Sequence, residues 1–312
     1  MLADFQVMIL PRISLKKSSM KLENLSNFYL VNKPRNWTSQ DLCTVFKKKY
    51  SFSKVGHSGT LDPNASGLML LATNKYTKLF DYLKDTNKTY EFEALFGVES
   101  DSFDTDTDVR EVESINLKLL QQELDDGIAS LTGKIKQTPP IYSAIKVDGK
   151  RLYKYARQNK NVDIPEREVE VSSFNLLNFE NNKATFSASV SKGTFIRSLV
   201  VDLASYLGTK AVVSSIVRTS IGNLNSKNSP IIDEIDTKTE NDIPAPLVWT
   251  ELFNLPVISV GDELIEEISN GNFLSNEYFG EKKLSIIENK NTILAIYEPY
   301  NENKFKPQRV LI

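Results

Sequence analysis

The chain has 312 residues, of which 40% are hydrophobic and 25% are charged, and its formal net charge at pH 7 is −2. This composition is typical of globular proteins and excludes a disordered or fibrous chain, while the length suggests two domains or one domain with an appendage. With one cysteine, Cys43, and one histidine, His57, an internal disulfide and a Cys₂His₂ or Cys₄ metal site are excluded. A single cysteine is typical of a reducing compartment.

The ends of the chain and its apolar runs indicate no membrane segment. No apolar run approaches the ~18 residues that a membrane-spanning helix requires. Residues 1–19 show no hydrophobic period, and no small-residue cleavage site follows the short apolar stretch at 7–10. We therefore expect residues 1–20 to be a poorly ordered extension.

Two helices and a strand are predicted in the first half of the chain. Thr38 and Asp41 match a helix-start box, and three lysines at 47–49 complete the last turn of that helix. Residues 90–96 are typical of a half-buried strand. Apolar residues at helical spacing over 117–131 predict a second helix, which Gly133 can cap.

The second half of the chain predicts a strand over 184–191, followed by a helix over 196–207 that Gly208 stops. The polar stretch 233–242 is interpreted as a linker, and short strand-like pieces from about residue 251 indicate a small β domain. Strands and helices mix without a strict βαβ rhythm, which favours the α+β class with a mixed, largely antiparallel sheet.

Charge is unevenly distributed along the chain. Residues 91–126 contain twelve acidic and two basic residues, whereas 133–160 contain eight basic residues, one acidic residue and three interleaved tyrosines. Basic side chains neutralise phosphates and aromatic rings stack on unpaired bases, so this stretch is either a nucleic-acid contact or a solvated surface. The acidic stretch 104–108 begins like a calcium loop but lacks its glycine and its final glutamate, so we interpret it as a solvated loop.

Residues 56–67 form the densest stretch of the chain, with three of its thirteen glycines and its only histidine. Pro63 disfavours helix at Asp62, and glycines let a loop approach a ligand closely. Asp62 is therefore either a buried carboxylate with a chemical role or the capping residue of a turn. No phosphate-binding loop, dinucleotide-binding turn or Ser–His–Asp triad is found, so the sequence indicates no nucleotide, nicotinamide or metal.

Gly56-His57-Ser58-Gly59-Thr60-Leu61-Asp62-Pro63 with Ser66-Gly67 resembles the G-H-[ST]-G-[AT]-L-D-P-x-A-[ST]-G signature of the TruB family of tRNA pseudouridine synthases. Further motifs follow in family order across about residues 28–220: Asn32-Lys33-Pro34, Lys88-Thr89-Tyr90, Pro140 to Lys146 with Gly149 to Arg157, and Ser191-Lys192-Gly193-Thr194-Phe195-Ile196-Arg197. Residues 269–272 and 306–311 only loosely resemble a PUA-type RNA-binding barrel.

Two positions depart from the family pattern. Asn36 stands where the upstream Lys-Pro motif usually has glycine, so the turn there is expected to differ. Phe195 replaces the usual tyrosine of the last motif, which keeps an aromatic ring for stacking and removes a hydroxyl group.

The resemblance implies a pseudouridine-synthase-like catalytic domain over 21–245, with an RNA-clasping insertion at about 133–162, and a PUA-like RNA-binding domain over 251–312. It also implies isomerisation of the T-loop uridine at position 55 of tRNA to pseudouridine, in which the N-glycosidic bond breaks and a carbon–carbon bond forms at C5. No atoms are gained or lost, so no cofactor and no metal are expected.

The same resemblance implies the residues that carry the reaction. Asp62 matches the family nucleophile, and Arg197 matches the arginine that pairs with it, since a buried carboxylate needs a nearby cation to stay ionised. Tyr90 would lie over the flipped base and is the candidate base for the C5 proton. Phe195 and Ile216 would pack around the uracil.

The resemblance further implies the RNA contacts. The target uridine must be extruded from the loop, and His57 matches the residue near the vacated space. Lys33 and Gly59 are further candidate substrate-binding residues. The insertion contributes three more: Lys150, Arg151 and Tyr153. The expected partner is the T-stem and loop of tRNA, with no membrane and no protein partner, and we expect a cytoplasmic monomer.

Two other functions were weighed against this one. A non-catalytic RNA-binding or tRNA-folding protein on the same scaffold would have no use for Asp62, Tyr90 and Arg197, all of which are present. An unrelated carboxylate hydrolase would explain the Asp62 motif but not the basic, tyrosine-rich insertion.

Overall fold

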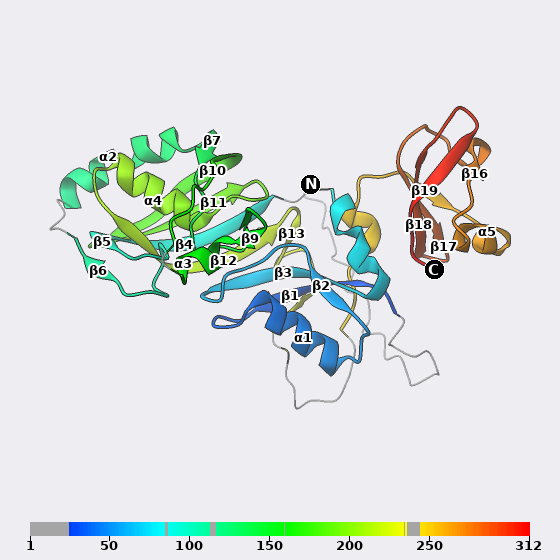
Figure 1. Ribbon diagram of the computed structural model, residues 1–312, viewed down its shortest axis with the longest axis horizontal. Helices are drawn as coiled ribbons and strands as arrows, with labels where there is room; N and C mark the ends of the chain where they lie inside the picture. The colour runs from blue at the N-terminus through cyan, green and yellow to red at the C-terminus, as the bar shows by residue number, and fades with distance from the viewer. Residues whose placement is uncertain (1–24, 85–86, 113–116, 159, 234, 236–243) are drawn as a thin grey trace, which may run out of the picture.

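The computed structural model describes residues 25–84, 87–112, 117–158, 160–233, 235 and 244–312, with side chains from 117 to 122 excepted. Two β-sheets follow each other along an elongated molecule, the N-terminal one with its helices at the left and centre of Figure 1 and the C-terminal one at the right. The predicted N-terminal extension and most of the predicted linker lie outside the described residues.

The N-terminal sheet has ten strands. Eight run in the order β14-β1-β3-β12-β4-β11-β10-β7, with β2 paired to β3 and β13 paired to β12. Only the pairs β1–β14 and β3–β12 are parallel, so the predicted mixed, largely antiparallel sheet is confirmed. The strands are β1 (Phe28–Lys33), β2 (Val55–His57), β3 (Ala65–Thr73), β4 (Lys88–Phe96), β7 (Gly133–Gln137), β10 (Arg167–Glu180), β11 (Lys183–Val190), β12 (Ala211–Ile221), β13 (Leu224–Asn225) and β14 (Ile231–Ile232).

Two short hairpins stand off this sheet, and several helices accompany the two sheets. The hairpins are β5 (Val98–Glu99) with β6 (Arg110–Glu111) and β8 (Lys146–Val147) with β9 (Lys150–Arg151). The helices are α1 (Ser39–Lys49), α2 (Leu117–Ser130), α3 (Leu152–Ala156), α4 (Ile196–Tyr206) and α5 (Ile265–Ser269), with 3₁₀ helices η2 (Asn74–Tyr82), η3 (Trp249–Leu252), η4 (Asp262–Leu264) and η5 (Asn276–Tyr278). No helix within the described ranges has the length and apolar character needed to cross a membrane.

The predicted helices begin and end near the expected residues. Thr38 and Asp41 form the capping box of α1, in which each side chain accepts a hydrogen bond from the other residue's backbone N–H. Helix α4 begins at Ile196 and ends before Gly208, whose φ of 67° takes the left-handed conformation common after helix ends. Helices α2 and α4 lie together over one end of the sheet, and α1 lies under β1 to β3 (Figure 1).

Strand β3 is buried on both faces. Met69 and Leu71 join the main core with α1, whereas Leu68 and Leu70 join a second apolar cluster on the opposite face. A strand covered on both sides has no solvent-facing positions, so its sequence is a continuous apolar run instead of an alternating one. Because β3 is buried, it anchors the end of the loop that precedes it, at Ala65.

The C-terminal sheet has five strands in the order β15-β17-β18-β19-β16. They are β15 (Val257–Ser259), β16 (Leu274–Ser275), β17 (Ser285–Asn289), β18 (Thr292–Pro299) and β19 (Lys304–Val310). The short strands expected from about residue 251 are therefore confirmed.

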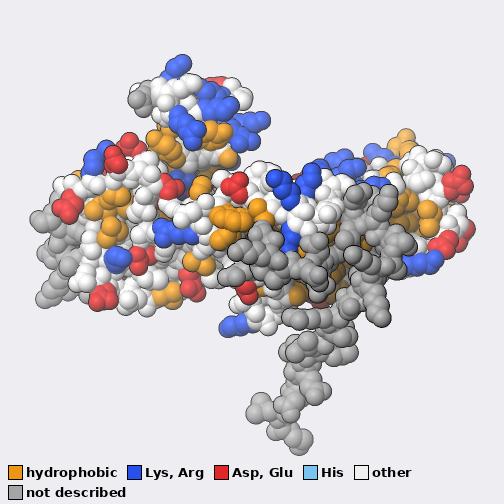
Figure 2. Space-filling model, turned by 90° about the horizontal axis from the view of Figure 1, so that it is seen from below, with side chains coloured by type: hydrophobic (Ala, Val, Ile, Leu, Met, Phe, Trp, Pro, Cys, Tyr) orange, Lys and Arg blue, Asp and Glu red, His pale blue; other side chains and the backbone are white. Residues whose placement is uncertain are grey.

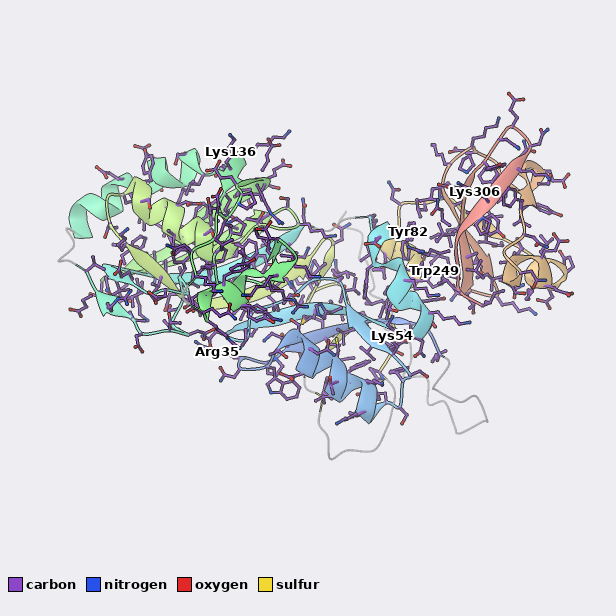
Figure 3. The ribbon with its side chains drawn as sticks, in the orientation of Figure 1. Arg35, Lys54, Tyr82, Lys136, Trp249 and Lys306 are labelled. Atoms are coloured by element: carbon purple, nitrogen blue, oxygen red, sulfur yellow. The ribbon has the colours of Figure 1, made fainter. Side chains whose placement is uncertain are left out.

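Residues of both sheets share the second apolar cluster, whose members are Phe28, Leu30, Leu68, Leu70, Ala72, Tyr76, Leu79, Ile221, Leu247, Trp249, Leu252, Phe253, Ile286, Ile293, Ile296 and Leu311. The Tyr76 hydroxyl accepts a hydrogen bond from the Ile293 N–H at 2.9 Å. Trp249 donates from Nε1 to the carbonyl of Asn291 at 2.9 Å, and Figure 3 shows it beside Tyr82 at the junction of the two sheets. The two units are thus joined by packing and by hydrogen bonds.

Candidate active site

Asp62 lies on the loop between β2 and β3, and neighbouring elements hold this loop by its backbone. The Ser39 hydroxyl, at the start of α1, accepts from the Leu61 N–H at 2.8 Å and donates to the Leu61 carbonyl at 3.0 Å. The N–H of Asn36 donates to the Pro63 carbonyl at 2.8 Å. The Asp62 side chain itself keeps 37% of its surface exposed, so a substrate can reach it.

Lys33 lies beneath this loop and does not line the cavity described below. Its Nζ donates to the carbonyls of Trp37 at 2.6 Å, Pro34 at 3.0 Å and Pro63 at 3.3 Å, and the residue is 0% exposed. Burial lowers the pKa of Lys33 to about 8, partly offset by the charge of Asp62. Lys33 was predicted to bind substrate. In the structure its ammonium group contacts backbone carbonyls, and the residue does not line the cavity.

Asn36 keeps the backbone conformation that its family counterpart would allow. Its φ is 67°, in the left-handed region where glycine is usual and asparagine is the best tolerated substitute. Whether the turn differs from that of the family stays a prediction, but a positive φ is one that glycine would also adopt. The asparagine takes up the positive φ, and its N–H still reaches the Pro63 carbonyl at 2.8 Å.

Arg197, in the first turn of α4, forms the centre of the site. Its Nη2 lies 2.9 Å from Asp62 Oδ2 and 2.9 Å from the Tyr142 carbonyl. Its Nη1 donates to the Ser102 carbonyl at 2.7 Å and lies 3.5 Å from Asp104 Oδ2. The residue is 3% exposed, so one buried guanidinium joins two carboxylates and two carbonyls.

Asp104 contradicts the interpretation of 104–108 as a solvated loop. It is 5% exposed, and its Oδ1 accepts hydrogen bonds from the Ser102 hydroxyl at 2.5 Å and the Asp106 N–H at 2.9 Å. The composition of this stretch is that of a surface loop, but the long-range pairing with Arg197 buries its first aspartate. The remaining acids, Asp106 and Asp108, are exposed as expected.

A cavity of about 340 Å³ opens beside the Asp62–Arg197 pair. Five other predicted site residues lie at this cavity. Four of them line it, namely Gly59, Tyr90, Phe195 and Ile216, and the fifth, His57, lies next to it. Tyr90 projects from β4 and Ile216 from β12, while Phe195 is the residue just before α4. Aromatic rings in the wall of a cavity that also holds a carboxylate can stack on a planar base.

His57 lines a neighbouring hollow of about 210 Å³, whose wall shares Lys88 and Lys192 with the Asp62 cavity. Burial, with the nearby charge of Arg218, lowers the pKa of His57 below its ordinary value, so the ring is neutral at pH 7. Its Nδ1 is buried and has no hydrogen-bond partner among the described residues. A buried, neutral ring suits a residue that fills space better than one that acts as an acid or a base.

The basic insertion projects over the site. Ser143, Ala144 and Ile145 line the Asp62 cavity, while Lys150, Arg151 and Tyr153 lie farther out on β9 and α3. Figure 2 shows Lys and Arg side chains gathered on a lobe that projects from the body, at the position along the long axis that α3 takes in Figure 1. The Nζ of Lys150 lies 4.4 Å from the centre of the Tyr155 ring, and this cation–π contact partly orders the Lys150 side chain.

Three residues of the site were not identified from the sequence. Besides Asp104, Gln137 is 2% exposed and grips the backbone of Phe195: its Oε1 accepts from the N–H at 2.8 Å and its Nε2 donates to the carbonyl at 3.2 Å. Arg218, on β12, lines the cavity with 1% of its surface exposed. A signal existed for Arg218, since it is a lone charge two residues after Ile216 in an apolar strand.

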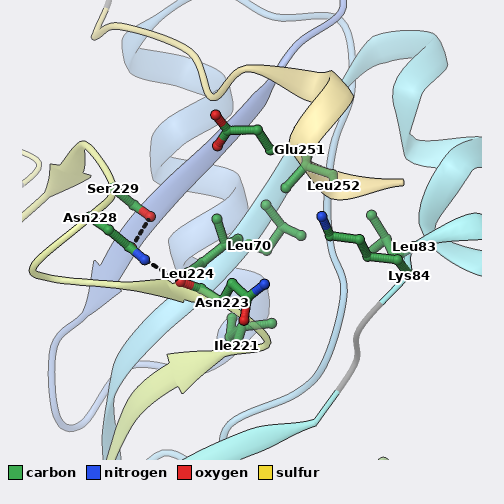
Figure 4. A pocket seen from close by; sticks show the side chains of 10 residues that line it. All are labelled: Leu70, Leu83, Lys84, Ile221, Asn223, Leu224, Asn228, Ser229, Glu251 and Leu252. Atoms are coloured by element: carbon green, nitrogen blue, oxygen red, sulfur yellow. Dashed lines mark hydrogen bonds between the residues drawn. The ribbon is translucent and has the colours of Figure 1, made fainter. Parts of the chain in front are cut away.

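A further hollow of about 350 Å³ lies away from Asp62, between β13 and η3 (Figure 4). Its floor is apolar, with Leu70 and Leu252, and its rim carries Asn223, Asn228 and Ser229, which hydrogen-bond to one another. In the parts of the chain that the structure describes, no cluster of His, Cys, Asp and Glu could hold a metal ion.

Similar proteins point to one family. A family model described as TruB family pseudouridylate synthase (N terminal domain) matches residues 47–196. The tRNA pseudouridine synthase B of Mesoplasma florum is 36% identical over 288 residues, which cover 92% of this chain and 98% of that protein. The protein of the same name from Bacillus cytotoxicus is 34% identical over 295 residues, covering 91% and 96%.

Solved structures agree in fold. The archaeal box H/ACA sRNP Nop10-Cbf5 complex matches with a TM-score of 0.65 at 18% identity, covering 95% of this chain and 89% of the matched chain. A Cbf5-Nop10-Gar1 complex matches with a TM-score of 0.64 at 20% identity, covering 93% and 86%. At this identity the structures support the fold, and the family rests on the relatives that share a third of their residues over nearly the whole chain. The chain belongs to the TruB family of pseudouridylate synthases.

Proposed function

We propose that this enzyme isomerises the T-loop uridine at position 55 of tRNA to pseudouridine, with Asp62 as nucleophile. As a member of its family it converts uridine in tRNA to pseudouridine. The observation that carries the finer proposal is the buried Arg197 that lies 2.9 Å from Asp62 at the edge of a cavity lined by Tyr90 and Phe195. The guanidinium holds the carboxylate in one position, and the exposed part of Asp62 would face the substrate.

The cavity walls supply the other parts of the reaction. The extruded uracil would lie between Tyr90 and Phe195, with Ile216 against it and Gly59 letting the nucleotide approach the backbone. After the N-glycosidic bond breaks, the base would turn over and C5 would bond to C1′, with Tyr90 receiving the C5 proton. His57, in the adjacent hollow, would support the RNA loop that the uridine has left.

The test is to incubate the purified protein with an unmodified tRNA transcript and to map pseudouridine chemically. We expect one modified position in the T-loop, at uridine 55, with no added cofactor or protein. Modification at another position would contradict the proposed site, and binding of the transcript without any pseudouridine would favour a non-catalytic RNA-folding protein.

The insertion is proposed to hold the tRNA by its phosphates. Charge reversal at Lys150, Arg151 and Lys154 is expected to weaken tRNA binding and to reduce the salt dependence of its affinity by up to about 0.9 in log–log slope for each lost contact. The single-turnover rate at saturating tRNA should change much less. Filter binding across a salt series, with single-turnover assays, measures both quantities.

The matched control reverses Lys47, Lys48 and Lys49, which place the same charge in the last turn of α1. This variant should retain the wild-type salt slope. An unchanged slope in the insertion variant would mean that the RNA binds elsewhere.

Phe195 allows a test of the proposed stacking. Phe195→Ala is expected to lose about 1–3 kcal/mol, the usual worth of stacking a base on an aromatic ring, whereas Phe195→Tyr should be nearly neutral if only the ring matters. Single-turnover rates of the three proteins measure the difference. A faster Phe195→Tyr enzyme would indicate that the hydroxyl found elsewhere in the family contributes. Wild-type behaviour of Phe195→Ala would show that the ring does not face the base.

The C-terminal sheet is proposed to add RNA contacts. Its strand β19 carries Lys304, Lys306 and Arg309, and the loose resemblance to a PUA-type barrel covers the same strand. Figure 3 shows Lys306 on this sheet. We propose that the enzyme acts as a monomer.

A further inference from the structure

Arg218 is the buried charge of the site for which the proposed reaction has no use so far. It lies on β12, two residues after Ile216, and is 1% exposed. Among the described residues no carboxylate forms an ion pair with it, whereas Arg197 is shared between Asp62 and Asp104. Burying an arginine without a carboxylate is costly, so its retention in this strand needs a reason other than packing.

The hydrogen bonds of Arg218 converge on the loop that carries Asp62. Its Nε donates to the carbonyl of Leu68 at 2.6 Å, and its Nη2 donates to the carbonyl of Gly59 at 3.3 Å. Gly59 precedes Asp62 by three residues, and Leu68 follows it by six. One rigid guanidinium thus joins the start of the loop to strand β3, through two nitrogens whose spacing is fixed by the planar group.

The backbone around Arg218 is fitted to this contact. Arg218 pairs with Gly67 of β3 and with Tyr90 of β4, so it lies directly between the loop's exit and the strand that carries the predicted base. Gly67 has a φ of 106°, and a Cβ there would lie 2.3 Å from the Arg218 carbonyl oxygen. Strands β3 and β12 are therefore in such close contact here that there is no room for a side chain at position 67.

A second buried cation holds the middle of the same loop. Lys33 donates to the Pro63 carbonyl at 3.3 Å, and burial together with the charge of Arg218 lowers the pKa of Lys33. Two buried cations therefore hold two carbonyls of the loop, those of Gly59 and Pro63, and a third carbonyl, that of Leu68, in the strand that follows it. Asp62 is the carboxylate that this loop presents.

We propose that Arg218 is a positioning residue for the reaction: it staples the Gly59 and Leu68 carbonyls, and thereby holds Asp62 at the distance from Arg197 at which it can attack. This inference rests on the proposed function of Asp62. A displacement of about 1 Å in a reacting group can cost on the order of 100-fold in rate, so the loss of the staple should appear in the catalytic step.

The experiment compares Arg218→Met and Arg218→Lys with the wild type. Arg218→Met keeps an unbranched apolar chain and removes all donors, and we expect its single-turnover rate on saturating tRNA transcript to fall on the order of 100-fold. Its tRNA affinity and salt slope should stay near those of the wild type, since most affinity comes from phosphate contacts. Arg218→Lys keeps the charge and one donor, so it should recover part of the rate.

The control is Arg110→Met, which removes an exposed arginine that pairs with Glu99 and Asp101. It should keep the wild-type rate. All assays are run well below the melting temperature of each protein, with the folded fraction measured by circular dichroism, so that a loss of folded protein is not counted as a loss of rate.

Three outcomes would overturn the proposal. A weaker affinity with a salt slope reduced by about 0.9 and an unchanged saturating rate would make Arg218 a phosphate contact. A lower melting temperature with an unchanged rate per folded molecule would make it a structural prop. A crystal structure of Arg218→Met in which residues 59–68 and the Asp62–Arg197 contact are unmoved would also contradict the staple.

The crystal structure keeps the inference separate from the proposed function. If the wild type and Asp62→Asn modified tRNA equally well, the role of Asp62 would fail, while a displaced loop in Arg218→Met would still support the staple. If Asp62→Asn were inactive but the Arg218 variants matched the wild type in rate and loop position, the role of Asp62 would stand and only the staple would fail.

Discussion

Replacing Asp62 with asparagine is expected to lower pseudouridine formation by at least about four orders of magnitude, because a neutral amide cannot act as the nucleophile. Binding of tRNA should stay within several-fold of the wild type, since affinity comes mainly from contacts to phosphates. The asparagine is nearly the same size and can still accept a hydrogen bond from Arg197. Single-turnover conversion and filter binding on the same transcript separate the two effects.

The matched control for this substitution is Asp101→Asn, which makes the same chemical change at an exposed carboxylate paired with Arg110. It should leave the rate unchanged. Appreciable turnover by Asp62→Asn would remove Asp62 from the reaction and would reopen the choice between an enzyme that uses another group and a non-catalytic RNA-folding protein.

Arg197→Lys is expected to lose on the order of 100-fold or more in rate, although the positive charge remains. The guanidinium contacts Asp62, Asp104 and two carbonyls at once, and an ammonium group on a flexible chain cannot reproduce this planar fork. The measurement is the single-turnover rate, with Arg110→Lys as the control for the same change at an exposed ion pair.

Near-normal kinetics of Arg197→Lys would show that charge alone suffices and that the fork does not direct Asp62. A protein that no longer folds would be recognised by its melting curve, and Asp62→Asn would then carry the test of the pair. Because Arg197 is buried, both the rate and the melting temperature should be measured for each variant.

Local signals in the sequence were sufficient for the elements that flank the site. The capping box of α1 and the apolar stripe of α4 each depend on residues within a few positions of one another, and both helices were predicted with nearly their observed bounds. The interruption of the α4 stripe by Arg197 also indicated that this charge is unusual. Its burial follows from the apolar neighbours that surround it in the helix.

Contacts between distant segments could not be predicted from the sequence. Asp104 lies 93 positions before Arg197, and in an acidic stretch nothing local separates it from its exposed neighbours. Gln137 lies in a β-strand at the sheet edge, and its grip on Phe195 depends on where α4 begins in space. Asn36, which breaks the family pattern, takes a positive φ that local sequence alone did not indicate.

The apolar cluster shared by the two sheets has a consequence for how the chain unfolds. Leu30 and Leu70 on one side and Ile286, Ile293 and Ile296 on the other bury one another, so removal of either unit would expose the surface of its neighbour. Loss of either unit is therefore expected to lower the melting temperature of the other. A fragment that ends near residue 245 should be less stable than the intact chain and prone to association through the uncovered face.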